Sequence, residues 1–426
     1  SIADGENLGS IPHLAAFKYK DYRFTWAANA LGGASTWTFL VASQWYVLAE
    51  SDSSGLVGLF TFASMLPFLV ASPLGGIFSD RMERKRLTAI TTGGTLAVIV
   101  IAAILAISGI LQLWHLCILA FISGSFRATQ ETSLVSLVTN IVPKKDLLNA
   151  ITLNAATRHG SRVIGMSILL STRLPVAEDF STAQFFCASA LFGLGSLAAI
   201  LLVSTRSIGE EAPTTGLTKG MIEGLKFIYT NRPVGIFIVL VAFHCSLVMS
   251  FDSILPVFSR DTIGSGDASL LALLVLSFGS GSVVGTFLIS GIGNEKGKGF
   301  LLIATGLISA ISPIGLGFSS TLVPAFIFKF LMGASQSTFM ALTMTFVQVF
   351  TPDRVRGRVS SLYILHAGGI MAFANLGYGN LADLFGVPEI LIVTGVIFLG
   401  AFVALSSIDP VLKDVYRGKN VQPSVV

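Results

Sequence analysis

Charged side chains are scarce in this chain. Of its 426 residues, 12% are charged and 53% are hydrophobic, whereas soluble domains carry about 25% charged residues. The mean hydropathy is +0.78. Because a soluble fold cannot hide so much apolar surface behind so few charges, the composition predicts a membrane protein with many spans. It leaves no soluble stretch long enough to hold an enzyme, so we expect no enzymatic activity.

Cysteines and secretory signals are also lacking. The three cysteines, Cys117, Cys187 and Cys245, are scattered within apolar segments, which excludes a disulfide framework and a metal site. The first ~20 residues lack the apolar core of a signal peptide, although a chain without an initiator methionine leaves an upstream segment open. A Walker-type phosphate loop is absent and the histidines are dispersed, so we expect no cofactor, no metal and no direct use of ATP.

Long apolar runs fill the sequence instead. A span needs about 20 apolar residues. Twelve runs qualify, at 24–49, 55–79, 87–108, 112–139, 147–170, 181–204, 233–259, 267–291, 299–318, 321–350, 356–382 and 387–408. The predicted fold class is therefore an all-α polytopic membrane protein with 12 transmembrane helices.

The basic residues predict the orientation of these spans in the bilayer. With both termini placed in the cytoplasm, 21 of the 27 Lys and Arg residues fall in inner segments, and only Arg173 and Arg260 fall in outer loops. Cytoplasmic loops of membrane proteins carry such an excess. The net charge of +4 then reflects these loops, and we expect no nucleic-acid partner.

The second half of the sequence repeats the first. Four pairs of residues share one offset of 209, namely Arg23 with Arg232, Gly76 with Gly285, Gly124 with Gly333, and Pro143 with Pro352. Chance matches among common glycines are the alternative. A duplicated six-span unit predicts two parallel repeats. The resulting domains are a cytoplasmic segment 1–23, a bundle 24–204, a cytoplasmic linker 205–232, a second bundle 233–408 and a cytoplasmic tail 409–426.

Several motifs resemble one transporter superfamily. The pattern Gly-x-x-x-Asp-Arg-x-x-Arg-Lys, from Gly76 to Lys85, is similar to the loop between the second and third spans of major facilitator transporters. Further segments resemble the branch of enterobactin exporters and macrolide-efflux proteins, and they lie at 149–150, 161–165, 254–261, 351–359 and 381–386. The resemblance covers nearly the whole chain and implies transport by alternating access.

Three positions depart from that pattern. Glu83 replaces the usual glycine before the basic pair, and the second-half copy of the motif, 285–298, has lost its aspartate. Residues 166–169 replace a Gly-Pro element that the family associates with antiport. These departures put proton antiport in question and leave open a receptor or sensor that does not transport.

Ionisable residues inside apolar spans are functional candidates, because burying them in a bilayer is costly. Arg127 and Glu131 lie four residues apart, on one helix face, and Arg158 lies at a similar depth in the next span. Two readings stay open, a structural network neutralised by Glu131 and an anion-binding surface. The predicted substrate-binding residues are Arg127, Arg158, Gln130, Trp37, Gln44, Phe243 and Gln336. For the aromatic and amide members, plain helix packing is the alternative.

Proton coupling and gating are assigned to a second group of residues. Glu131 and Asp252 are the candidate proton carriers, with His159 and His244 read either as titrating groups or as packing residues. The resemblance implies that Asp252 and Lys329 face one cavity and can pair there, and that Asp80 contacts the start of the eleventh span near Gly357. The predicted gating residues are Asp80, Arg84, Arg162 and Lys329. For Asp252 and Lys329 the alternative is a static ion pair. For Arg84 the alternative is that its charge only sets the orientation of the spans.

The predicted function is secondary active transport in the inner or plasma membrane. The expected substrate is a small, amphipathic, anionic or zwitterionic organic molecule, such as a siderophore or drug, which a monomer exports. The proton is the candidate coupling ion. Within transport, a lipid or lysolipid flippase or a facilitated transporter remains the alternative, because a positive cavity also suits a phosphate head group.

Overall fold

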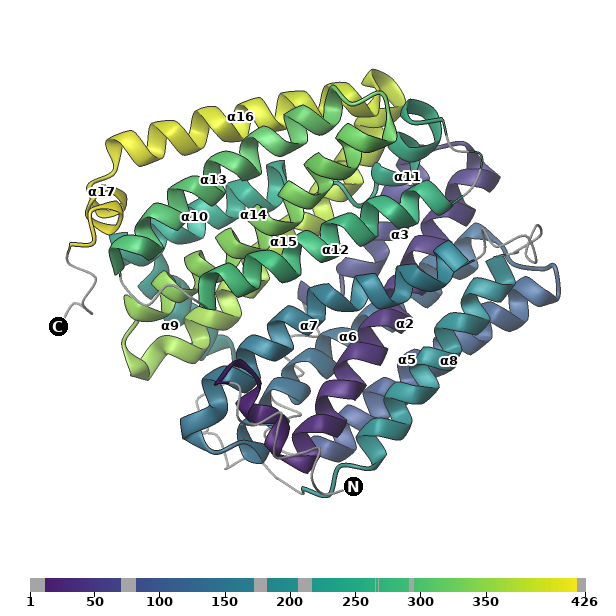
Figure 1. Cartoon of the computed structure of the whole chain (residues 1–426), viewed down its shortest axis with the longest axis horizontal. Coiled ribbons are helices and arrows are strands. Elements are labelled where there is room, and N and C mark those ends of the chain that lie inside the picture. Colours follow the sequence, from purple (N-terminus) through teal and green to yellow (C-terminus); the bar gives the residue numbers. More distant parts are fainter. Residues whose placement is uncertain are drawn as a thin grey trace. The chain divides into compact units, whose positions relative to one another are not determined.

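The computed structural model describes residues 12–69, 82–171, 182–205, 217–264, 266, 268–290 and 295–419. Within these ranges the chain is a succession of helices with short connections (Figure 1). The all-α fold class predicted from the apolar runs is confirmed.

The first part of the chain begins with a short 3₁₀ helix and continues in long α-helices. Their bounds are η1 (Pro12–Lys18), α2 (Lys20–Ser51), α3 (Ser54–Met65), α5 (Arg84–Ile107), α6 (Leu113–Ile141), α7 (Lys144–Ser171), α8 (Thr182–Leu201) and the amphipathic α9 (Leu217–Thr230).

The second part follows the same plan with one interrupted span. Its elements are α10 (Arg232–Leu247), α11 (Leu255–Val257), the π-helical η2 (Phe258–Thr262), α12 (Ser269–Ser290), α13 (Glu295–Gly317), α14 (Leu322–Val349), α15 (Asp353–Phe385), α16 (Val387–Ile408) and α17 (Pro410–Tyr416). Ten of the twelve expected spans coincide with one helix to within four residues at either end. The second span is described only as far as residue 69, and the seventh is broken.

Length and composition agree with spans of a bilayer. Of the described helices, seven are long and apolar enough to cross a membrane, and α9 with α10, bent by 99°, forms an eighth candidate. Helices α2, α6 and α7 are just as long but are not among these seven. They carry more polar side chains, including most of the candidate site residues of the first half.

The broken seventh span is held by side chains of other helices. Helix α10 ends at Leu247, and helical structure resumes only at Leu255. The Gln336 amide of α14 donates to the Val248 carbonyl at 2.8 Å. Non-helical backbone at membrane depth persists only where protein or water satisfies its polar groups.

Helix α15 supplies further partners for the same break. The Tyr378 hydroxyl donates to the Ser246 carbonyl at 2.5 Å, and the Ser253 amide donates to Asn375 Oδ1 at 3.1 Å. The interruption is thus a built feature of the fold, and Asp252 lies within it.

The chain divides into two compact units. One comprises residues 1–50 and 66–212, and the other comprises residues 51–65 and 213–426. In the first unit α5 packs against α6 and α8, and in the second α14 packs against α12 and α13 while α3 packs against α15. Residues 51–65, which the repeat pattern assigns to the first bundle, therefore make their contacts within the second unit.

Candidate functional site

An ion pair joins α6 and α7 in the first unit. Arg158 Nη2 lies 2.5 Å from Glu131 Oε2, and the two side chains are 59% and 35% exposed. Charged side chains within spans face a water-filled space or a protein interior rather than lipid. This exposed pair therefore indicates a water-accessible surface on the first unit.

Arg127 adds a second positive charge to this surface. It lies one helical turn before Glu131 on α6 and is partly exposed, with its guanidinium carbon 5.6 Å from the Phe68 ring centroid. Two arginines against one carboxylate leave an excess positive charge, which suits the oxygens of a carboxylate or phosphate.

The uncharged candidates of the first unit are held by neighbouring helices. Gln130 Nε2 donates to Thr92 Oγ1 of α5 at 2.8 Å, and Gln44 is buried in α2. The Arg162 guanidinium carbon lies 3.6 Å from the Trp37 ring centroid, and Arg162 is 8% exposed. A cation on an aromatic face gains electrostatic attraction, so Arg162 and Trp37 fasten α7 to α2.

Close packing explains the motif at residues 161–165. A Cβ on Gly165 would lie 2.8 Å from the Ala34 carbonyl oxygen of α2. The Thr38 hydroxyl also donates to the Gly165 carbonyl at 3.3 Å. The motif thus brings α7 and α2 together beside Arg162.

The second unit contains the remaining binding and coupling candidates. Lys329 of α14 is fully buried, with Nζ 3.4 Å from the Phe251 ring centroid and 4.9 Å from that of Phe278. Asp252 is partly buried beside Phe251 in the break. Among the contacts of the described residues no ion pair joins Asp252 to Lys329, so their pairing stays a prediction. Phe243 is 40% exposed.

The gating candidates fall in different places. Arg84 Nη1 donates to the Ser136 carbonyl at 3.1 Å and also to Asn140 Oδ1, which ties the start of α5 to the end of α6. Asp80 lies outside the described residues.

Three charged residues that sequence reasoning left out of the site make prominent contacts. Arg260 Nη2 lies 2.7 Å from Asp52 Oδ1, and Asp383 accepts hydrogen bonds at the start of α3. For Arg260 and Asp383 the available signal was their position in the family-like segments 254–261 and 381–386. Because neither segment has an apolar pattern that places it near residue 52, this contact is visible only in the fold.

His244 behaves as a packing residue. It is fully buried, its Nε2 lies 2.7 Å from the Ser309 hydroxyl, and its ring stacks on Phe339 with centroids 4.5 Å apart. Within the described residues no three His, Cys, Asp or Glu side chains gather in a way that could hold a metal ion.

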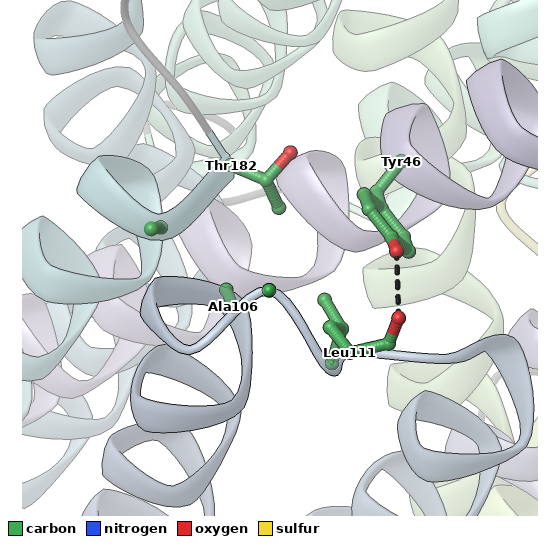
Figure 2. Close-up of a pocket in the computed structure, with 6 residues that line it drawn as sticks. Tyr46, Ala106, Leu111 and Thr182 are labelled. Carbon is green, nitrogen blue, oxygen red and sulfur yellow. Dashed lines mark hydrogen bonds between the residues drawn. The ribbon is translucent and has the colours of Figure 1, made fainter.

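A small pocket lies at the ends of α2, α5 and α8 (Figure 2). Its volume is about 240 Å³, and the Tyr46 hydroxyl at its edge donates to the Leu111 carbonyl at 3.0 Å. Pockets for organic ligands typically hold about 300–1,000 Å³. None of the predicted substrate-binding residues is among the residues that line it.

Solved structures define the class of protein. A D-xylose–proton symporter superposes with a TM-score of 0.71 at 14% identity, covering 93% of this chain and 98% of the symporter. A POT family transporter in complex with 5-aminolevulinic acid gives a TM-score of 0.71 at 11% identity, covering 92% of this chain and 97% of that chain. The chain therefore has the major facilitator fold.

The family is shown by sequence. The family model described as transmembrane secretion effector matches residues 11–417, so the chain belongs to this family of major facilitator transporters. It is a multi-pass membrane transporter and not an enzyme, and the resemblance noted in the motifs is confirmed.

Two curated relatives span nearly the whole chain. Macrolide efflux protein A of Streptococcus pyogenes is 21% identical over 415 residues, which cover 93% of this chain and 98% of the relative. The Staphyloferrin A transporter of Staphylococcus aureus is 19% identical over 376 residues, covering 88% of this chain and 92% of the relative.

Proposed function

We propose that this protein is a secondary active transporter that exports an amphipathic, anionic or zwitterionic organic molecule by alternating access. The observation that carries the proposal is the exposed pair of Arg158 and Glu131, with Arg127 one turn away. The efflux function in the name of the streptococcal relative supports export. We further propose that it works as a monomer in the plasma membrane, with both termini in the cytoplasm.

In the proposed site the substrate competes with Glu131 for Arg158. An anionic group of the substrate can replace the Glu131 carboxylate on the guanidinium fork, because both offer paired oxygens. Substrate binding at Arg158 and the charge of Glu131 are therefore linked.

The experiment uses the purified protein in proteoliposomes that enclose a pH-sensitive dye. A proton gradient is imposed and a catecholate siderophore, a macrolide, a cationic dye and a lysolipid are added in turn. Wild type is compared with Glu131→Gln, Asp252→Asn and the control Glu50→Gln, which removes an exposed carboxylate at the far end of α2.

We expect substrate-dependent proton flux in wild type and the control, and its loss in one of the two site variants. Because Glu131→Gln also removes the competitor of the substrate, the KM for an anionic substrate should fall several-fold in that variant. Substrate movement without proton flux, unchanged in both variants, would refute the proton sites and leave a facilitated or lipid-type transporter. Binding without movement would favour a sensor.

A further inference from the structure

Two family-like segments that the substrate site does not use meet at the connection between α2 and α3. Asp383, in the last turn of α15, lies in the segment 381–386, and Arg260 lies in the segment 254–261. Both contact residues 52–55. By the predicted orientation this connection lies on the outer side of the membrane.

The Asp383 carboxylate caps α3. Its Oδ1 accepts the Ser54 amide at 2.7 Å, and its Oδ2 accepts the Gly55 amide at 2.9 Å and the Ser53 hydroxyl at 2.9 Å. The first amides of a helix have no partner within the helix, and the positive end of the helix favours a negative charge. This cap is supplied by a residue about 330 positions away, rather than by the usual neighbour in sequence.

Arg260 forms an ion pair with Asp52, two residues before the start of α3. Its Nη2 lies 2.7 Å from Asp52 Oδ1, and its Nε lies 2.6 Å from Asp261 Oδ1. Asp52 has φ +51°, a left-handed conformation that few residues with a side chain adopt. The Asp52 side chain is 82% exposed, so water can replace the ion pair when the segment moves.

Beneath these contacts α3 and α15 meet along a smooth, closely packed face. A Cβ on Gly379 would lie 2.5 Å from the Ser54 carbonyl oxygen, and a Cβ on Gly58 would lie 3.2 Å from the Gly379 Cα. Small residues allow such an approach between backbones without interlocking side chains. The polar contacts at residues 52–55 fasten the start of α3 to the end of α15, and Phe62 with Phe373 and Met65 with Asn375 join the same helices further along.

The chain enters and leaves this segment from the other unit. Residues 51–65 belong to the second unit, while residues 1–50 and 66–212 on either side belong to the first. We call residues 51–65 the crossing segment. Any rearrangement of one unit against the other must strain or release it.

We propose that Asp383 and Arg260 are gating residues that clasp the crossing segment to α15 on the outer side and must release it before that side opens. This inference rests on the alternating access of the proposed function. It adds Asp52, Arg260 and Asp383 to the gating set drawn from the sequence.

The test is hydrogen–deuterium exchange of the full chain in lipid nanodiscs, without any substrate. Wild type is compared with Asp383→Ala and Arg260→Gln, which remove the two clasp contacts separately. The matched control is Glu389→Gln, an exposed acid near the start of α16 that makes no described contact with the crossing segment.

Releasing the clasp should accelerate exchange of the amides at 54–57 about ten-fold, since charge-assisted hydrogen bonds contribute at this level. If the clasp gates, amides at the inner end of α6, residues 136–141, should exchange more slowly, because opening one side closes the other. The control should match wild type.

Unchanged exchange at 54–57 in both clasp variants would overturn the proposal. Faster exchange at both ends would also overturn it, because it would mean a general loss of stability. Neither readout involves transport, so a failed transport assay with opposite exchange changes would count against the proposed substrate and not against the clasp.

Discussion

Two buried cations in this chain lie on aromatic rings. Arg162 lies over Trp37, and Lys329 lies over Phe251 and Phe278. An aromatic face attracts a cation and offsets part of the cost of burying it. The sequence marks both cations, because ionisable residues stand out in apolar runs. It cannot name their partners, since Trp37 and Arg162 come from spans far apart in the chain.

Outside the spans, the Asp21 carboxylate makes hydrogen bonds whose contribution to stability should depend on pH. Its Oδ2 accepts hydrogen bonds from the Thr205 hydroxyl at 2.5 Å and from the amides of Thr205 and Ser204 at 2.7 and 3.1 Å. Partial burial raises the pKa of the Asp21 carboxyl, but these hydrogen bonds outweigh burial and hold the pKa below its usual value of 3.8.

We predict that Asp21→Asn lowers the free energy of unfolding by about 1 kcal/mol at neutral pH, after allowance for solvent screening. A carboxyl whose pKa is depressed in the folded state stabilises the fold above its unfolded pKa and loses this contribution as the pH falls through the folded pKa. The difference from wild type should therefore begin to shrink as the pH falls below 3.8, and it should disappear once the pH is below the folded pKa. Thermal unfolding in detergent at several pH values measures it.

The control for this prediction is Glu50→Gln, at the opposite end of the same helix. Glu50 is exposed, so its variant should unfold like wild type at every pH. A difference between Asp21→Asn and wild type that persists unchanged at pH 3 would contradict the role given to the carboxylate charge.

At the scale of elements, glycines decide how closely α12 and α14 approach. A Cβ on Gly333 would lie 2.0 Å from the Phe278 carbonyl oxygen, and one on Gly285 would lie 2.3 Å from that of Ala334. Both glycines are among the pairs that revealed the repeat. Their recurrence therefore has a packing reason in the second unit, where backbones touch without side chains between them.

We predict that Gly333→Ala destabilises the protein by about 2 kcal/mol or more, because no flexible side chain can move to admit the new methyl group. Gly400→Ala is the matched control, since a Cβ there would meet nothing within 4 Å. The control should be neutral or slightly stabilising, as alanine favours a helix over glycine. Thermal unfolding of both variants measures the difference. Equal stability of the two would contradict the prediction and would mean that α12 and α14 can move apart to admit the methyl group.

The sequence predicts the spans well but not the break in the seventh. Apolar runs report length and burial, which suffices for ten helices. Helix continuity at residues 248–254 depends on Gln336, Asn375 and Tyr378, which satisfy the freed backbone from α14 and α15. Such partners lie about 90–130 residues away, so local patterning carries no trace of them.

The second span shows the same limit. Its apolar run is visible in the sequence, yet the cap on its first turn comes from Asp383 in the eleventh span. Asp80 comes directly after the second span. The family resemblance implies that its carboxylate contacts the start of the eleventh span on the inner side. The contact of Asp383 with α3, which the predicted orientation puts on the outer side, uses the same physical device between the second and eleventh spans, with the capping and capped helices exchanged.

At the scale of the whole molecule, duplication and contact divide the chain differently. The offset of 209 places residues 55–79 within the first repeat, whereas residues 51–65 make their contacts in the second unit. A sequence repeat records ancestry and orientation, while contacts record one conformation. The domain boundaries drawn from the repeat stay a prediction, and the crossing segment is the place where the contacts divide the chain differently.

The orientation of the molecule gives the last prediction. The excess of Lys and Arg on one side predicts that α9 lies inside the cell and that the connection around Gly266 lies outside. Thr230 and Gly266 are both exposed, so cysteines at these positions report opposite sides of the membrane. In intact cells a membrane-impermeant maleimide should label Gly266→Cys and leave Thr230→Cys unlabelled until the cells are lysed. The native cysteines lie within spans and provide the background, measured on the unsubstituted chain. Labelling of Thr230→Cys in intact cells would reverse the orientation, and with it the side on which the clasp of Asp383 and Arg260 acts.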